Sequence, residues 1–170
     1  MLNKKMNEAL NEQINAEFYA AYLYLAMSAY FHKQGMSGFA NWMRVQYQEE
    51  LAHCTKFFDY IAERGGEIDL LPIEKVPSDF KSTLEIFERT LKHEEHVTEC
   101  INNLANLAIE VNDHATQSFL KWYIDEQVEE EANVQSIIDS LRLVNGEGQG
   151  LFLLDRELAQ RKFVDPTKNA

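Results

Sequence analysis

The stretch MRVQYQEELAHCTKFFDYI, residues 43–61, places a glutamate and a histidine inside an otherwise apolar helical pattern. Its apolar side chains recur at alternating intervals of four and three residues, the spacing that gathers them on one face of an α-helix. Glu50 occupies one position of that face, and His53 follows it by three residues. The stretch therefore predicts a core-facing helix that carries a Glu-x-x-His pair.

Three other segments repeat this arrangement, and each apolar face is again interrupted by a glutamate. Helix-breaking residues occur at only a few places between the segments. We predict four long helices over 5–34, 38–64, 79–110 and 114–144, and a shorter one over 150–163. The other three faces consist of Leu10, Ile14, Glu17, Ala21, Tyr24, Ser28 and Phe31; of Leu84, Phe87, Leu91, Glu94, Thr98, Ile101, Ala105 and Ala108; and of Leu120, Tyr123, Gln127, Glu130, Val134, Ile137, Leu141 and Val144.

The lengths of the helices and links predict an all-α four-helix bundle. Each long helix would extend about 40–48 Å at 1.5 Å per residue. The links near Gly35 and Asn112 are so short that they join antiparallel neighbours, whereas segment 65–78 can span about 45 Å, one bundle length. We expect one domain over 1–170, with the bundle over about 5–144. Ser78 and Asp113 are the expected N-caps, and Gly65 and Gly146 the expected C-caps.

Four glutamates are expected to converge at mid-height of the bundle: Glu17, Glu50, Glu94 and Glu130. Their faces contain no Lys or Arg, and an unpaired buried carboxylate costs several kcal/mol. The cluster must therefore either hold protons, with His53 an ordinary core histidine, or bind cations. His53 favours cations, because a Glu-x-x-His pair is half of the di-iron motif of helical bundles. Oxygen ligands with one imidazole suit iron or manganese.

The charge balance of the chain limits the kinds of partner that it can bind. The chain has 28 Asp and Glu against 16 Lys and Arg, for a formal net charge of −12. This balance argues against nucleic acid and favours cations as partners. The N-terminal sequence lacks a signal-peptide pattern and the longest apolar run is too short to span a bilayer, so no membrane association and a cytoplasmic location are expected. Cys54 and Cys100 lack metal-type spacing and are expected to be reduced.

Four segments make the chain similar to bacterial ferritins of the non-haem type over essentially its whole length. They are LNEQINAEFYAAYLYLAM (10–27), YQEELAH (47–53), KHEEHV (92–97) and FLKWYIDEQVEEE (119–131). The resemblance implies a ferroxidase centre with two irons per subunit. Glu17, Glu50 and His53 would hold one iron, and Glu50, Glu94 and Glu130 the other, with Glu50 as the bridge and Gln127 nearby.

The resemblance also implies a third iron site at Glu49, Glu126 and Glu129, with Glu130 shared, although from spacing alone these residues could form a solvated face. Tyr24 resembles a family tyrosine near the centre, which implies that it supplies a hydrogen bond or an electron there. The alternative is that its ring only fills the core. Trp122 is expected to pack. Leu51 and Gln127 differ from the haem-binding relatives, so no haem is expected. The remaining histidines are expected to be solvated or to lie between subunits: His32, His93, His96 and His114.

The function implied by the resemblance is oxidation of Fe(II) by O2 or H2O2 and storage of the ferric mineral in a hollow homo-oligomer of 24 subunits. The exposed apolar run Leu151–Leu154 in the fifth helix independently indicates self-association. Two alternatives remain open at this point. One is a small di-metal oxidase or peroxidase without mineral storage, and the other is a protective shell of the Dps type.

Overall fold

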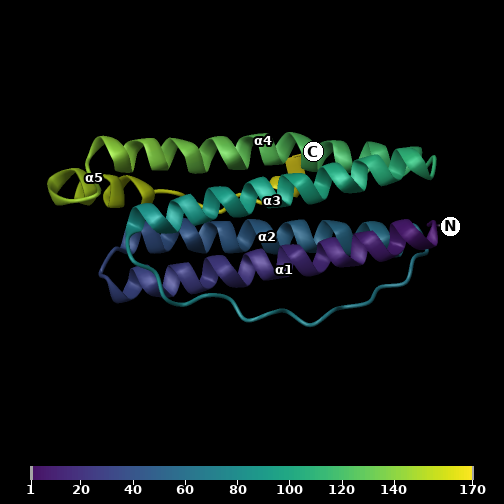
Figure 1. Cartoon of the computed structure of the whole chain (residues 1–170), viewed down its shortest axis with the longest axis horizontal. Helices are drawn as coiled ribbons and strands as arrows, with labels where there is room; N and C mark the ends of the chain where they lie inside the picture. Colours follow the sequence, from purple (N-terminus) through teal and green to yellow (C-terminus); the bar gives the residue numbers. More distant parts are fainter. Residues whose placement is uncertain (1, 170) are drawn as a thin grey trace.

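The computed structural model describes residues 2–169, which form helices and no strand. Figure 1 shows four long helices side by side and a short fifth helix at one end. This arrangement confirms the predicted all-α class. The elements are α1 (Lys4–Lys33), α2 (Ser37–Glu63), α3 (Thr83–Glu110), α4 (His114–Leu143), α5 (Gly148–Leu158) and the short 3-10 helix η1 (Pro166–Asn169).

The connections follow the predicted topology. Helices α1 and α2 pack as one antiparallel hairpin and α3 and α4 as another, and α1 packs on α3 to join the two hairpins. The segment 64–82 runs along the outside of the first hairpin from one end of the bundle to the other (Figure 1). As a result α2 and α3 are parallel, as the long crossover requires.

Two apolar clusters fill the two ends of the bundle. One contains Phe31, Phe39 and Phe87, and the other contains Phe57 and Leu120. In every long helix the buried glutamate stands between residues of one cluster and residues of the other. The four glutamates therefore form a polar layer between two apolar layers, at the common height that the sequence predicts.

Two helix boundaries differ from the prediction by more than two residues. Helix α3 begins at Thr83 instead of residue 79, and its N-cap is Ser82 instead of Ser78. The Ser82 hydroxyl accepts a hydrogen bond from the Glu85 backbone N–H, and the Glu85 carboxylate accepts one from the Lys81 N–H. A glutamate three residues after the cap stabilises a helix start, and Ser78 is followed by lysine at that position.

Helix α5 spans 148–158 instead of 150–163. It ends early because the Asn41 amide donates to the backbone oxygens of Leu158 and Arg161, at 3.1 and 3.0 Å, and so fixes a turn after the helix. The predicted cap Asp113 is confirmed. Gly65 adopts the left-handed conformation beyond α2, and after α4 both Asn145 and Gly146 do so.

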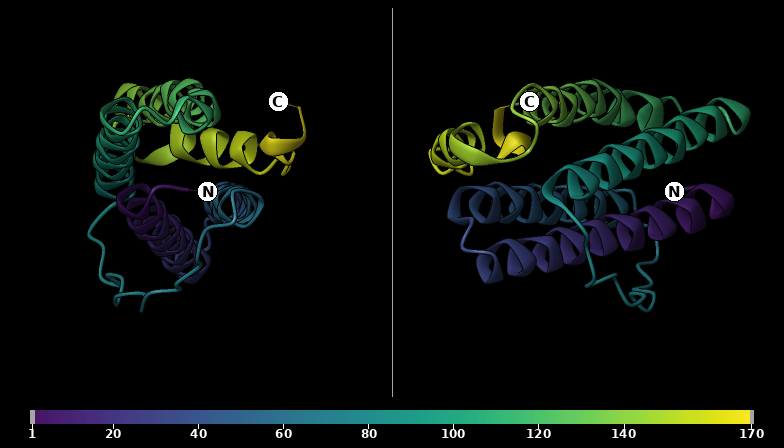
Figure 2. Two further views of the ribbon diagram at one scale, coloured as in Figure 1. Left: turned by 90° about the vertical axis from the view of Figure 1, so that its right-hand side faces the viewer. Right: turned by 60° about the vertical axis from the view of Figure 1, so that its left-hand side comes forward.

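Figure 2 shows α5 lying across the end of the bundle. Leu154 and Leu158 are buried in the chain's own core, and Leu151 packs against it. The expected exposed patch is therefore reduced to Phe152 and Leu153, which stay 62% and 66% exposed. Among the described helices, none has a long enough apolar stretch to cross a membrane.

Candidate metal centre

The four long helices each contribute one buried carboxylate to the same layer. The exposed fractions of Glu17, Glu50, Glu94 and Glu130 are 1%, 2%, 1% and 4%. No Lys or Arg nitrogen of residues 2–169 lies within 4.0 Å of any of these four carboxylates. The buried cluster, defined as these four glutamates and His53, therefore brings four carboxyl groups together away from water and without a Lys or Arg partner.

His53 lies beside carboxylates of three helices. Its Nδ1 lies 3.4 Å from Glu50 Oε2 and 3.9 Å from Glu17 Oε2, and its Nε2 lies 3.9 Å from Glu126 Oε1. Ligand atoms of Glu17, Glu50 and His53 lie within 4.8 Å of one another, as do those of His53, Glu126 and Glu130. Glu17 Oε2 and His53 Nε2 are buried without a hydrogen-bond partner. Each of these unsatisfied atoms lies beside another potential ligand atom, and a cation would satisfy both.

Neutral donors orient the carboxylates. Gln13 Nε2 donates to Glu17 Oε1 at 2.8 Å, and Gln46 Nε2 donates to Glu130 Oε2 at 2.8 Å. Each bond uses one oxygen of its carboxylate and leaves the other for a ligand. Sequence reasoning missed both glutamines. Gln13 lies one turn before Glu17 and could have been found from spacing, whereas the Gln46 contact joins two different helices.

Gln127 and Tyr24, which are predicted near the centre, both contact Glu94. Gln127 Nε2 lies 3.2 Å from Glu94 Oε2, and the Tyr24 hydroxyl donates to Glu94 Oε1. Tyr24 is fully buried, so its hydroxyl has a fixed partner in the layer. The Trp122 ring packs 5.5 Å from the His53 ring and therefore fits the expected packing role.

Burial shifts the pKa values of the buried cluster toward protonated carboxyls. It raises the pKa of Glu17 to about 8, with repulsion from Glu50 adding to the effect. Burial and the charge of Glu130 raise the pKa of Glu94 to about 8, and burial raises that of Glu50 to about 7. Burial lowers the pKa of His53, but the surrounding carboxylates outweigh it and hold that pKa well above its usual value. At neutral pH the metal-free cluster therefore retains protons, which an incoming cation would displace.

The residues predicted for a third site are brought together only in part. Glu126 lies beside His53 and Glu130, whereas Glu129 is exposed on α4. Glu49 forms an ion pair with Arg161, whose Nη2 lies 2.8 Å from Glu49 Oε2. Arg161 was not anticipated, because it lies more than 100 residues away in the chain and follows α5.

The histidines outside the apolar faces differ in their exposure to solvent. His32, His96 and His114 are exposed, in agreement with the prediction of solvated side chains. His93 is half-buried, with its ring 6.0 Å from the rings of both Tyr19 and Tyr24. His93 is therefore not solvated, because the two tyrosines of α1 cover it, and a place between subunits stays a prediction for it.

The comparisons with known proteins agree with this geometry. The family model described as a ferritin-like domain matches residues 7–144, which include all four buried glutamates. The chain belongs to the ferritin family. The ferritin is 43% identical over 161 residues to a bacterial non-heme ferritin of Bacteroides fragilis, covering 95% of this chain and 100% of that protein. It is 45% identical over 163 residues to one of Staphylococcus saprophyticus, covering 96% and 98%.

Solved ferritin structures have the same fold. An engineered closed form of the Archaeoglobus fulgidus ferritin matches this ferritin with a TM-score of 0.95 and 49% identity, covering 96% of this chain and 100% of that one. The open-pore ferritin of the same archaeon matches with a TM-score of 0.94 and 49% identity, covering 95% and 100%. The fifth helix lies outside the segment that the family model matches.

Proposed function

We propose that this ferritin oxidises Fe(II) to Fe(III) with O2 or H2O2 at the buried cluster and stores the ferric product as a mineral. The observation that carries the proposal is the layer of four buried carboxylates and His53, with unsatisfied ligand atoms and no Lys or Arg partner among the described residues. Carboxylates favour the more highly charged Fe(III) over Fe(II), so such a site lowers the free energy of the oxidised product. The family and the names of its relatives support iron as the metal.

The residues divide into two ligand sets that share Glu50. Glu17 Oε2 and His53 Nδ1 face one side of Glu50 and would hold the first Fe(II). Glu94 and Glu130 would hold the second. Gln13 and Gln46 donate to one oxygen each of Glu17 and Glu130 and leave the other free, whereas the two oxygens of Glu94 accept from Tyr24 and Gln127, which a metal would replace in part. Two Fe(II) then give one electron each to O2, which with two protons becomes H2O2. No haem takes part in this scheme.

Storage requires a compartment, which we propose is a shell of 24 copies in the cytoplasm. Such a shell would have a mass of about 470 kDa, from 24 copies of 19.7 kDa. The similarity to solved ferritins over nearly their whole chains supports assembly with further copies of this chain. A particle of this mass that retains iron would separate storage from a small di-metal oxidase. Retained iron without DNA protection would separate it from a Dps-type shell.

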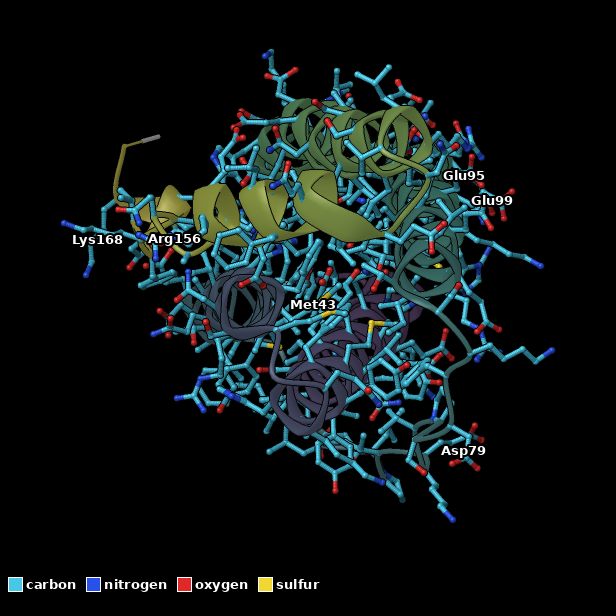
Figure 3. The ribbon with its side chains drawn as sticks, turned by 90° about the vertical axis from the view of Figure 1, so that its left-hand side faces the viewer. Met43, Asp79, Glu95, Glu99, Arg156 and Lys168 are labelled. Atoms are coloured by element: carbon cyan, nitrogen blue, oxygen red, sulfur yellow. The ribbon has the colours of Figure 1, made fainter. Side chains whose placement is uncertain are left out.

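The ferroxidase proposal is tested by paired variants on α3. Glu94 lies in the buried cluster, whereas its neighbour Glu95 is exposed and points outward with Glu99 (Figure 3). We expect Glu94→Ala to lower the initial rate of Fe(II) oxidation at least tenfold, and Glu95→Ala to leave it unchanged. The rate is followed by near-ultraviolet absorbance after air is admitted to the anaerobic Fe(II)-loaded protein. Wild-type rates in Glu50→Ala and His53→Ala would contradict the proposal.

A further inference from the structure

An arginine from the C-terminal segment reaches the side of the buried cluster that α2 and α4 form. Arg161 Nη2 donates to Glu49 Oε2 at 2.8 Å, and Nη1 donates to Gln46 Oε1. The guanidinium lies 4.7 Å from the centre of the Trp42 ring, within the range of a cation–π interaction. The side chains of Arg161 and Glu49 are only 22% and 13% exposed. This ion pair is therefore largely withdrawn from water, unlike an ordinary surface pair.

The backbone around Arg161 is fixed. Asn41 of α2 donates to the backbone oxygens of both Leu158 and Arg161. The Asp155 carboxylate accepts hydrogen bonds from the backbone N–H groups of Gly38 and Phe39 at the start of α2, at 2.8 and 3.0 Å. Figure 3 shows α5 crossing in front of the bundle between α2 and α4. These contacts therefore hold the Arg161 guanidinium beside Glu49 and Gln46 of α2.

The contacts of Arg161 continue into the buried cluster. Gln46, which accepts from Arg161, donates through its amide to Glu130 Oε2 at 2.8 Å. The two other carboxylates predicted for the third site, half-buried Glu126 and exposed Glu129 of α4, have no Lys or Arg nitrogen of residues 2–169 within 4.0 Å. We name Glu49, Glu126 and Glu129 the outer carboxylates. Within the described chain, Arg161 is thus the one Lys or Arg whose side-chain nitrogen lies within 4.0 Å of an outer carboxylate.

We propose that Arg161 is a positioning residue that withholds Glu49 from a third metal ion beside the buried cluster. Glu49 must give up the guanidinium before its Oε2 can ligate a metal, and the positive charge of Arg161 repels a cation at the same place. Arg161 thereby keeps the outer carboxylates a weak, transient site through which iron passes. This inference rests on the proposed function, since it assumes that Fe(II) first occupies the buried cluster.

The test is an anaerobic Fe(II) titration of the assembled apo-protein, followed by calorimetry. We expect Arg161→Gln to bind a third Fe(II) per subunit about tenfold more tightly than the wild type, with the first two ions unchanged. Arg156→Gln is the matched control, because it removes the same charge from an exposed position on α5 (Figure 3). It should behave as the wild type does. Arg161→Lys keeps the positive charge but not the paired donors of the guanidinium, and it should bind the third Fe(II) almost as weakly as the wild type does.

A double-mutant cycle assigns the effect to Glu49. Glu49→Gln should change third-ion affinity little in the wild type, where Arg161 already holds the carboxylate, and should abolish the gain in the Arg161→Gln background. The inference is overturned if Arg161→Gln and Arg156→Gln bind the third Fe(II) with equal affinity. It is also overturned if Arg161→Gln still binds the third ion more tightly when Glu49 is replaced, or if no variant binds a third ion. Failure of the proposed function is a separate result, because the first two Fe(II) would then not bind to the wild type.

Discussion

At the scale of single residues, Glu17 shows how burial prepares a carboxylate for a metal. Its Oε1 accepts from Gln13, and its Oε2 has no hydrogen-bond partner. A carboxyl group in this state binds a proton more tightly in the folded protein than in the unfolded chain. Fe(II) must displace that proton, so the same burial that creates the site also makes its affinity depend on pH.

The stability of the apo-protein should fall as pH rises. Burial raises the pKa of Glu17 from 4.5 to about 8. Between these values the native state binds more protons than the unfolded state, so the contribution of Glu17 is fully present below pH 4.5 and is lost through pH 8. We expect the apo melting temperature to fall from pH 6 to pH 8.5. Glu17→Gln should reduce that fall and raise the melting temperature at pH 8.

The matched control for this prediction is Glu12→Gln, since Glu12 is exposed on the same helix. It should leave the pH dependence of the melting temperature unchanged. Saturation of the wild type with a redox-inert divalent ion should remove the destabilisation at pH 8, because the ion replaces the protons. A wild-type melting temperature that rises steadily to pH 8.5 would contradict the assignment.

Tyr24 should adjust the pH at which the centre works. Burial raises the pKa of Glu94, but the hydroxyl of Tyr24 and the amide of Gln127 act in the opposite direction. Tyr24→Phe removes one donor to the charged carboxylate and should raise the pKa of Glu94 further. We expect the pH profile of Fe(II) oxidation to move to higher pH, with a several-fold lower rate at pH 6.5. Tyr22→Phe, at a 52% exposed position on α1, is the control. If Tyr24→Phe and Tyr22→Phe oxidise Fe(II) with the same pH profile, Tyr24 does not influence the reaction.

At the scale of helices, the sequence predicts whatever depends on local spacing. The interval of three and four residues identified all four core faces, since every residue assigned to them is buried or half-buried. Boundaries were less accurate where the deciding contact is distant or easily overlooked. The end of α5 depends on Asn41, more than 100 residues earlier. The start of α3 depends on Ser82 together with Glu85, a signal that was present in the sequence.

The docking of α5 should depend on Asp155. Its carboxylate caps α2 by accepting from Gly38 and Phe39, and a Cβ at Gly38 would lie 1.6 Å from the Asp155 backbone oxygen. Loss of a helix cap costs about 1 kcal/mol. We expect Asp155→Ala to lower the free energy of unfolding by about that amount and to speed proteolysis within residues 145–165. Gly38→Ala should act more strongly, because two backbones must separate.

Glu157→Ala provides the control for α5, because Glu157 is exposed on the same helix. It should change neither the unfolding free energy nor the rate of cleavage. If Asp155→Ala is cleaved no faster than Glu157→Ala, α5 is held by its apolar side chains Leu154 and Leu158 and the cap is incidental.

At the scale of the whole molecule, the cluster was predictable because four helices of similar length place their middle residues at one height. The direction of each helix does not affect that result. The contacts of Gln46 and Arg161 were not predictable, because they depend on how α4 and the segment after α5 lie against α2. The sequence therefore indicates which groups form the layer, and the tertiary arrangement determines which of them remain free to bind a metal.

The net charge of −12 per chain should direct Fe(II) toward the protein. In a shell of 24 copies the formal charge would be −288, and its field would raise the local concentration of a divalent cation. Salt screens such a field, with a Debye length of about 10 Å at 0.1 M ionic strength and about 30 Å at 0.01 M. We expect the oxidation rate at subsaturating Fe(II) to fall several-fold between 10 and 300 mM NaCl. The rate at saturating Fe(II) should change little, because the buried cluster is shielded from solvent. Equal sensitivity to salt in both regimes would mean that salt acts on the centre itself and that the surface charge does not gather the iron.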